Sequence, residues 1–422
     1  MQPTSSNKAS RFLLTPMLAA AFVLAPMCLL SNAQAGGFLD GLQIHFENHT
    51  KSSFKIGNSH YRIQIKGQLN FTDLDDDVAS LDGYAMFEEN RDKKKYRIEF
   101  SNDANGKVER HYFVDGREQA LDSEGKKWLA AMIPVALRET AIDAKGRVNR
   151  LIAKGGADAV LAEVELTHND YSQRLYLIAL CKNATLNPAQ QQRLLVASSR
   201  IDSDFEVRQV LQSVIKHQSL NPLAQAQLLN RVAKIDSDFE QRQVLIAITP
   251  TLHDDADVLA AWQKALAKVD SDFEVRQVLG AFAKRDKLSG APLEAALQAS
   301  MKINSDFEHR QVLVALARQM RPENAAQLSA FLKSAQKISS DFERRVTLVS
   351  LLEHGKLGKG DYLLFLDALK GMGSDFEVRT ILQALAKQMP LDPALVERYR
   401  QVASTLGDFE RGQAEKSLAR LN

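Results

Sequence analysis

Ser203-Asp204-Phe205-Glu206 opens a unit that recurs along this chain of 422 residues. The aromatic residue of the unit falls at Phe205, Phe239, Phe273, Phe307, Phe342, Phe376 and Phe409, and an earlier copy carries Tyr171. From Tyr171 onward the steps are 34, 34, 34, 34, 35, 34 and 33 residues. A period of this size is typical of a solenoid, in which each unit buries its apolar face only against its neighbours.

The unit from Ser203 to Asp236 is predicted to be a helical hairpin. Ser203 and Glu206 have the spacing of a capping box, in which the Ser oxygen accepts from a first-turn amide and the Glu reaches back to the Ser amide. The apolar residues that follow have helical spacing, namely Val207, Val210, Leu211 and Val214. Asn221-Pro222 then opens a second helix, because Asn caps well and Pro suits the first helical position.

Charged residues recur with the caps. The acidic residue after each cap lies four residues before an Arg, which predicts ion pairs within the helix worth about 0.2–0.5 kcal/mol each. These pairs are Asp170–Arg174, Asp204–Arg208, Asp238–Arg242, Asp272–Arg276, Asp306–Arg310, Asp341–Arg345 and Asp375–Arg379. An alternative is that the repeated acids and arginines form a ligand-binding ladder. The repeated Phe is expected to pack under the neighbouring hairpin.

These patterns predict an α-solenoid of about eight hairpins over residues 169–422. The tetratricopeptide family has the same period, but its Trp, Gly-Tyr and Ala/Phe positions do not match this unit. A HEAT-like solenoid fits better. The last unit carries Gly407 and Gly412, with Glu415 and Lys416 where other units are apolar, and is expected to be a polar C-terminal cap.

Residues 59–121 alternate between apolar and polar types, which predicts an antiparallel meander of four or five strands. Asp115-Gly116 is a strong signal for a two-residue hairpin turn. Residues 36–58 are expected to be a linker or an irregular strand, and residues 122–168 an irregular helical cap at the N-terminal end of the solenoid. The predicted fold class is therefore α+β, a small sheet followed by an α-solenoid.

The first 35 residues have the pattern of a secretory signal peptide. A basic start with Lys8 and Arg11 precedes an apolar run over residues 12–30, and Ala33-Gln34-Ala35 predicts cleavage after Ala35. The alternative is an uncleaved membrane anchor, which Pro16 and Pro26 disfavour. We therefore expect a periplasmic or secreted protein that is not inserted stably in a membrane after cleavage.

Without residues 1–35 the chain has 52 Lys and Arg against 52 Asp and Glu, since Lys8 and Arg11 leave the total of 54 and no acid is lost. This balance gives no electrostatic reason to expect a nucleic-acid partner. Cys181 is then the one remaining cysteine, so an internal disulfide is excluded and a buried thiol is expected.

Two patterns resemble metal sites weakly. His45 and His49 are four residues apart, but no third ligand is evident. Asp73, Asp75 and Asp77 match the start of a calcium loop, yet Val78 replaces the required Gly and Tyr84 the closing Glu, so a solvated acidic turn is expected. The nine His residues lie beside no evident nucleophile. We therefore predict no catalytic, cofactor-binding or metal-binding residues, with a hydrolase as a remote alternative.

Several strings resemble one bacterial region. They are Ile65-Lys66-Gly67, Asp75-Asp76-Asp77-Val78, Gly83-Tyr84, Phe87-Glu88-Glu89 and Tyr112-Phe113-Val114-Asp115-Gly116-Arg117-Glu118, followed by Trp128-Leu129 and the repeats. Together they resemble the extracytoplasmic region associated with membrane zinc peptidases of the beta-lactam-sensor type, and also free-standing secreted proteins. The sequence has no His-Glu-x-x-His motif, so the resemblance implies a sensing or binding role and carries over no catalysis.

The leading expectation is a non-enzymatic scaffold that binds another envelope or secreted protein or a peptide. The alternative is a ligand-sensing or regulatory module that works with a membrane metallopeptidase in antibiotic or envelope-stress signalling. Solenoids offer a broad surface and little enclosed volume, which favours the scaffold.

Overall fold

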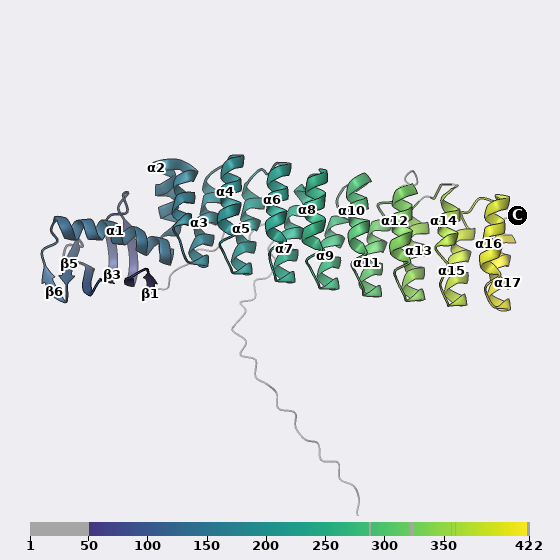
Figure 1. Cartoon of the computed structure of the whole chain (residues 1–422), viewed down its shortest axis with the longest axis horizontal. Coiled ribbons are helices and arrows are strands. Elements are labelled where there is room, and N and C mark those ends of the chain that lie inside the picture. Colours follow the sequence, from purple (N-terminus) through teal and green to yellow (C-terminus); the bar gives the residue numbers. More distant parts are fainter. Residues whose placement is uncertain (1–49, 287, 321–324, 356, 359, 420–422) are drawn as a thin grey trace, which may run out of the picture. The chain divides into compact units, whose positions relative to one another are not determined.

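The computed structural model describes residues 50–286, 288–320, 325–355, 357–358 and 360–419. It has an N-terminal six-stranded antiparallel sheet followed by helices in a solenoid arrangement (Figure 1). The predicted fold class is confirmed. All the described residues belong to one compact unit.

The sheet is a simple meander in which each strand pairs with the next. Its strands are β1 (Thr50–Ile56), β2 (Ser59–Phe71), β3 (Val78–Arg91), β4 (Lys94–Asn102), β5 (Val108–Val114) and β6 (Arg117–Gln119). The hairpin turn predicted at Asp115-Gly116 joins β5 to β6, and both residues have positive φ angles, 49° and 80°. Strands β2 to β6 lie within the predicted meander, and β1 lies in the stretch that was expected to be a linker or an irregular strand.

Helix α1 (Ser123–Thr140) covers one face of the sheet. Its residues Trp128, Leu129, Met132 and Ile133 are buried in one core with sheet residues such as Phe87 and Ile98. Asp122 caps the helix by accepting from the amides of Glu124 and Gly125. The apolar spacing that predicted this helix therefore also selects the face that packs against the sheet.

Helix α2 (Ala144–Glu165) starts the second hydrophobic core and bends at Gly155 and Gly156. Gly156 has φ 67° and ψ −161°, a backbone region that is essentially restricted to glycine. The bend therefore depends on this residue.

Seven hairpins and a last helix follow within the described ranges (Figure 1). The first helices of the hairpins are α3 (Asp170–Asn183), α5 (Asp204–His217), α7 (Asp238–Ile248), α9 (Asp272–Phe282), α11 (Asp306–Ala317), α13 (Asp341–His354) and α15 (Asp375–Ala386). The second helices are α4 (Pro188–Ser198), α6 (Pro222–Val232), α8 (Ala256–Leu266), α10 (Gly290–Ser300), α12 (Ala325–Ala335), α14 (Asp361–Asp367) and α16 (Pro393–Ala403). The last helix is α17 (Asp408–Ala419).

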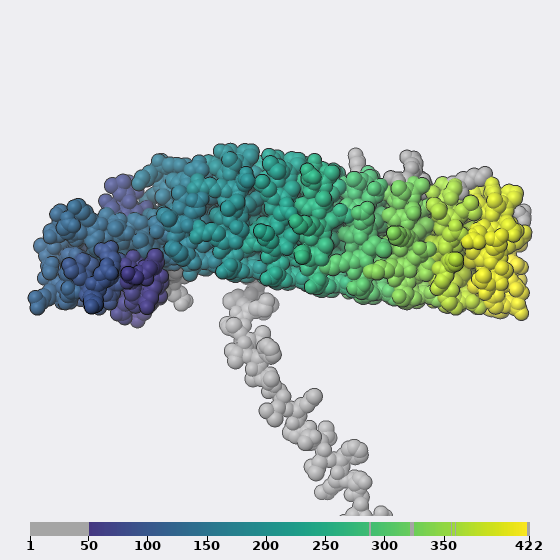
Figure 2. Space-filling view, viewed as in Figure 1, coloured from purple at the N-terminus to yellow at the C-terminus, as the bar shows by residue number. Residues whose placement is uncertain are grey.

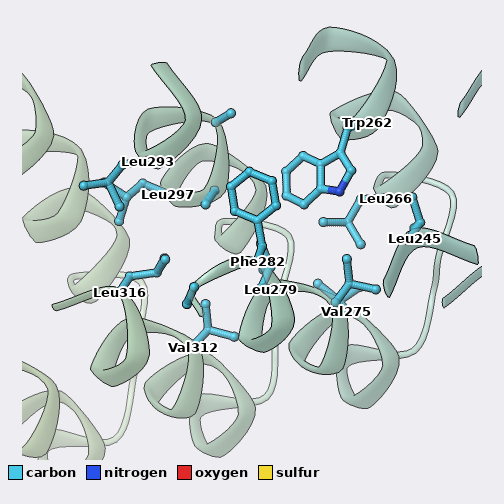
Figure 3. Close-up of a cluster of buried hydrophobic side chains, with 14 of the residues drawn as sticks. Leu245, Trp262, Leu266, Val275, Leu279, Phe282, Leu293, Leu297, Val312 and Leu316 are labelled. Atoms are coloured by element: carbon cyan, nitrogen blue, oxygen red, sulfur yellow. The ribbon is translucent and has the colours of Figure 1, made fainter. Parts of the chain in front are cut away.

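The odd-numbered helices from α3 to α17 pack against one another in one row, and the even-numbered helices pack in a second row. Between the rows lies one continuous apolar core. Trp262 of α8 and Phe282 of α9 face each other in this core, with ring centroids 4.3 Å apart (Figure 3). In the space-filling view the sequence colours follow one another in bands along the repeats, so each part of this surface comes from one or two hairpins (Figure 2).

Candidate functional site

The caps of the odd-numbered helices are joined to the preceding repeat. In α7 the Ser237 hydroxyl accepts from the Glu240 amide at 3.4 Å, as the capping box predicts. However, the Ser237 amide donates to Asp204 of the previous repeat at 2.8 Å, and the Asp236 amide donates to the same carboxylate oxygen at 3.1 Å. The second half of the predicted capping box is therefore wrong, since a carboxylate from the neighbouring repeat accepts the Ser amide.

The same bond recurs at each repeat boundary. The acceptors and the donor amides are Asp170 and Ser203, Asp238 and Ser271, Asp272 and Ser305, Asp306 and Ser340, Asp341 and Ser374, and Asp375 and Gly407, at 2.7–2.9 Å. Hydrogen bonds to an ionised acceptor are roughly twice as strong as neutral ones. The recurring Asp therefore fixes the start of the next hairpin.

The recurring Arg also reaches into the next repeat. Arg242 pairs with Glu274 at 2.8 Å, and both side chains are mostly buried. Equivalent pairs are Arg174–Glu206, Arg208–Glu240, Arg276–Glu308, Arg310–Glu343, Arg345–Glu377 and Arg379–Glu410. The predicted Asp–Arg pairs within each helix are therefore wrong. The Asp of one helix instead accepts from the cap amide of the following helix, and the Arg pairs with the Glu of that helix. These charged groups therefore already have partners within the protein.

The recurring Phe is exposed, contrary to the prediction that it packs under the next hairpin. From Phe205 to Phe376 the exposed fraction is 46–55%, and for Phe409 it is 70%. The helix geometry explains this, because Phe205 lies two residues before the buried Val207 and so about 200° around the helix. The apolar residues of the helix therefore face the core, and the Phe faces solvent.

From Phe205 to Phe376, each Phe ring contacts the Arg of its own helix. The guanidinium carbon lies 4.8–5.0 Å from the ring centroid in every unit from Phe205 to Phe376, and Arg174 lies 4.9 Å from Tyr171. Such a contact contributes about 0.5–1 kcal/mol at an exposed site. The remaining ring surface faces solvent, so the odd-numbered helices carry a row of exposed aromatic groups, which we call the Phe row (Phe205, Phe239, Phe273, Phe307, Phe342, Phe376 and Phe409).

The Phe row has the chemistry of a protein-binding surface. Neighbouring packed helices lie about 8–10 Å apart, so one aromatic ring is presented at each such step. Aromatic side chains are enriched where proteins contact one another, because they bury a large area with few rotatable bonds. The charged groups beside them are already paired, so apolar side chains of a partner suit this surface better than phosphates do.

The structure also places the residues of the two weak metal patterns. His45 and His49 and the predicted cleavage site at Ala35 lie outside the described residues. Asp75 is buried and pairs with Arg147 at 2.7 Å and with Arg150 at 2.6 Å, so the expectation of a solvated acidic turn fails at this residue, whereas Asp73 is exposed. Two arginines thus occupy the carboxylate that a calcium ion would need. Within the part of the chain that is described, no three His, Cys, Asp or Glu side chains come together as a metal site.

The structure brings together one His and two Ser residues that sequence reasoning did not connect. Nε2 of His309 lies 2.8 Å from the Ser334 hydroxyl, which in turn lies 2.8 Å from the Ser300 hydroxyl. His309 is 1% exposed and both serines are fully buried, so substrate has no access to them. Burial, followed by the charge of Lys337, lowers the pKa of His309 to about 4. The trio is a polar contact within the core.

Cys181 is buried, as predicted, and burial raises its pKa to about 12. A thiol in this environment is a weak nucleophile, because the thiolate is the reactive form. Cys181 therefore has the character of a core residue.

Comparisons with models of protein families, with curated proteins and with solved structures found no match. Among the described helices, none has both the length and the apolar composition required to cross a bilayer.

Proposed function

We propose that this protein is an exported, non-enzymatic scaffold whose Phe row binds an extended peptide segment of another envelope or secreted protein. The observation that carries the proposal is the exposure of the same aromatic position in every repeat from Phe205 to Phe409. Export rests on the signal-peptide pattern of residues 1–35.

An extended peptide fits the spacing of the row. A polyproline II segment has three residues per turn and rises about 3.1 Å per residue, so equivalent side chains recur at about 9 Å. Packed helices lie about 8–10 Å apart, so an apolar side chain at every third position meets successive Phe rings. Proteins that recognise this conformation commonly use aromatic surfaces.

Charge supports a polypeptide partner over a nucleic acid. The Arg side chains beside the rings are paired with glutamates of the next repeat, as Arg242 is with Glu274. Nucleic-acid affinity depends on lysines and arginines that are free to neutralise phosphates. The Phe row offers apolar area without that excess of positive charge.

The test is a binding titration of residues 36–422 with synthetic labelled peptides that carry Leu at every third position in a Pro-rich background. We expect binding, and we expect the triple variant F239A/F273A/F307A to bind at least about tenfold more weakly. A matched control is V196A/L223A/L391A, which removes three exposed apolar residues that lie outside the row, with exposed fractions of 62%, 66% and 46%.

Circular dichroism would establish that both triple variants remain folded. Equal affinity of the Phe variant and the wild type would overturn the proposal, as would equal loss in both variants. A peptide with Leu at every fourth position is expected to bind more weakly, and tighter binding of that peptide would exclude the polyproline register.

A further inference from the structure

A cavity of about 380 Å³ lies between the sheet and helix α1, far along the sequence from the repeats. Its walls are aromatic on several sides, with Tyr61 of β2, Tyr96 of β4, Tyr112 of β5 and Trp128 of α1. The Trp128 ring stacks on Tyr96 and is tilted against Tyr112, with centroid distances of 5.7 Å in both cases. The volume falls in the range of small-molecule sites.

A buried carboxylate lines the same cavity. Glu89 of β3 is 4% exposed, and its two oxygens accept from the Ser59 hydroxyl at 2.7 Å and from the Trp128 indole N–H at 2.8 Å. Both donors are neutral. The nearest cation is Arg91, whose guanidinium lies 3.8 Å from Glu89 and is half exposed.

This arrangement leaves Glu89 suited to a cationic ligand. Burying an ionised carboxylate is costly unless the charge is paired and hydrogen-bonded. A carboxylate accepts about four hydrogen bonds, so the two from Ser59 and Trp128, with the Tyr61 hydroxyl also interacting with Glu89, leave capacity for a donor from a ligand. Aromatic faces around such a group stabilise an ammonium further, as in the aromatic cages that bind methylated amines.

The cavity also has cations at its edge. Arg91 lies over the Tyr96 ring at 6.0 Å, and Lys127 pairs with Glu124 at 2.8 Å on the exposed side of α1. The lining thus contains two acids and two bases, with Glu89 inside and Arg91 half exposed. This distribution complements a ligand that carries one positive and one negative group.

We propose that the cavity binds a zwitterionic α-amino acid with an apolar or aromatic side chain. Its ammonium donates to Glu89 against the aromatic walls, and its carboxylate pairs with Arg91. Its side chain contacts Met132 and Val135, which line the α1 side. This site is independent of the Phe row, because it draws on the sheet and α1 alone.

The test uses isothermal titration calorimetry on residues 36–422 with three related probes. Phenylalanine carries both charges, phenethylamine only the ammonium, and 3-phenylpropionate only the carboxylate. We expect phenylalanine to bind most tightly and each of the other two at least about tenfold more weakly. With the unmodified protein, a lack of phenylalanine binding would overturn the proposal. An affinity for 3-phenylpropionate equal to that for phenylalanine would also overturn it.

Substitutions then show which side chain binds which charged group of the ligand. Glu89→Gln is expected to weaken the binding of phenylalanine and phenethylamine at least about tenfold but not that of 3-phenylpropionate, because the Glu89 carboxylate competes for Arg91, which lies 3.8 Å away. Arg91→Gln should weaken the binding of phenylalanine and of 3-phenylpropionate. The matched control is Glu88→Gln on the opposite face of β3, where Glu88 is equally buried but pairs with Lys95 at 3.0 Å and Arg62 at 3.5 Å. Unchanged phenylalanine affinity in Glu89→Gln would contradict the proposal, as would an equal loss in Glu88→Gln.

Discussion

The position of one residue within the unit decides whether it is buried, capping or exposed. The position four residues after the cap is Val in three repeats, Val207, Val275 and Val378, and polar in the others, among them the buried Gln241 and His309. Gln241 is accommodated by donating to the carbonyls of Val232 and Ala265 at 3.1 Å. His309 is accommodated by the Ser334 hydroxyl. The core thus tolerates a polar side chain where the second helix supplies its partner.

This buried His predicts a pH effect on stability. The pKa of His309 is about 4 in the folded protein, against about 6.5 for an unfolded chain. Between these values the unfolded state binds more protons, so stability falls as the pH drops from about 6.5 to about 4, by about 3 kcal/mol in total. Above about pH 6.5 the full stability is retained.

The measurement is urea unfolding of the wild type and of His309→Gln at about pH 7 and about pH 4.5. Gln is the residue that another repeat carries at this position, as Gln241. Since carboxylates titrate in both proteins, the difference between the two pH responses isolates His309. Parallel pH responses of the two proteins would show that His309 is not protonated on unfolding in this range.

At the scale of helices and strands, the sequence predicted what is local and missed what crosses from one repeat to the next. The cap at Ser237 and the apolar stripe of α7 follow from residues within one turn or two. The partners of Asp204 and Arg208, by contrast, lie 32 or 33 residues further along. The signal for these contacts was present in the recurrence itself, because residues one period apart come to lie side by side in a stacked repeat.

The contribution of the hydrogen bonds from the recurring Asp to the cap of the next odd-numbered helix can be tested at Asp272. Asp272→Ala removes the acceptor for the amides of Asn304 and Ser305, which lie at 3.1 and 2.7 Å. The loss is expected to cost about 1–3 kcal/mol in the free energy of unfolding, because the partly buried Ser305 amide is left without its partner. Chemical denaturation followed by circular dichroism measures this cost.

The matched control is Asp270→Ala, only two residues earlier. The side chain of Asp270 is 96% exposed and lies 3.7 Å from Lys302, so its removal should change the free energy of unfolding by less than about 0.5 kcal/mol. If both variants lost the same stability, the effect at Asp272 would be a general loss of negative charge near the helix N-terminus.

At the scale of the whole described chain, two hydrophobic cores are joined by buried charges. One core lies between the sheet and α1, and the other runs through the repeats from α2 onward. Between them, Asp75 of the β2–β3 turn pairs with Arg147 and Arg150 of α2, and Arg147 also pairs with Glu163 at 2.8 Å. This joint could not be predicted from the sequence, because Asp75 lies 72 and 75 residues from its partners and the contact does not recur with the repeats.

We expect this joint to couple the sheet to the repeats. Asp75→Asn keeps the shape of the side chain and suits the positive φ angle of 58°, but it leaves the buried Arg147 and the partly buried Arg150 with less negative charge. Breaking a buried ion pair by removing one partner typically costs 3–5 kcal/mol, and we expect a loss of about 3 kcal/mol in the free energy of unfolding here because Glu163 still pairs with Arg147.

Hydrogen exchange should accelerate in β2, β3 and α2 and remain slow in α7 to α11, since each repeat depends on its nearest neighbours. Asp73→Asn in the same turn is exposed and should leave exchange unchanged. Uniform acceleration across all the helices in Asp75→Asn would instead show that the sheet and the repeats unfold as a single cooperative unit.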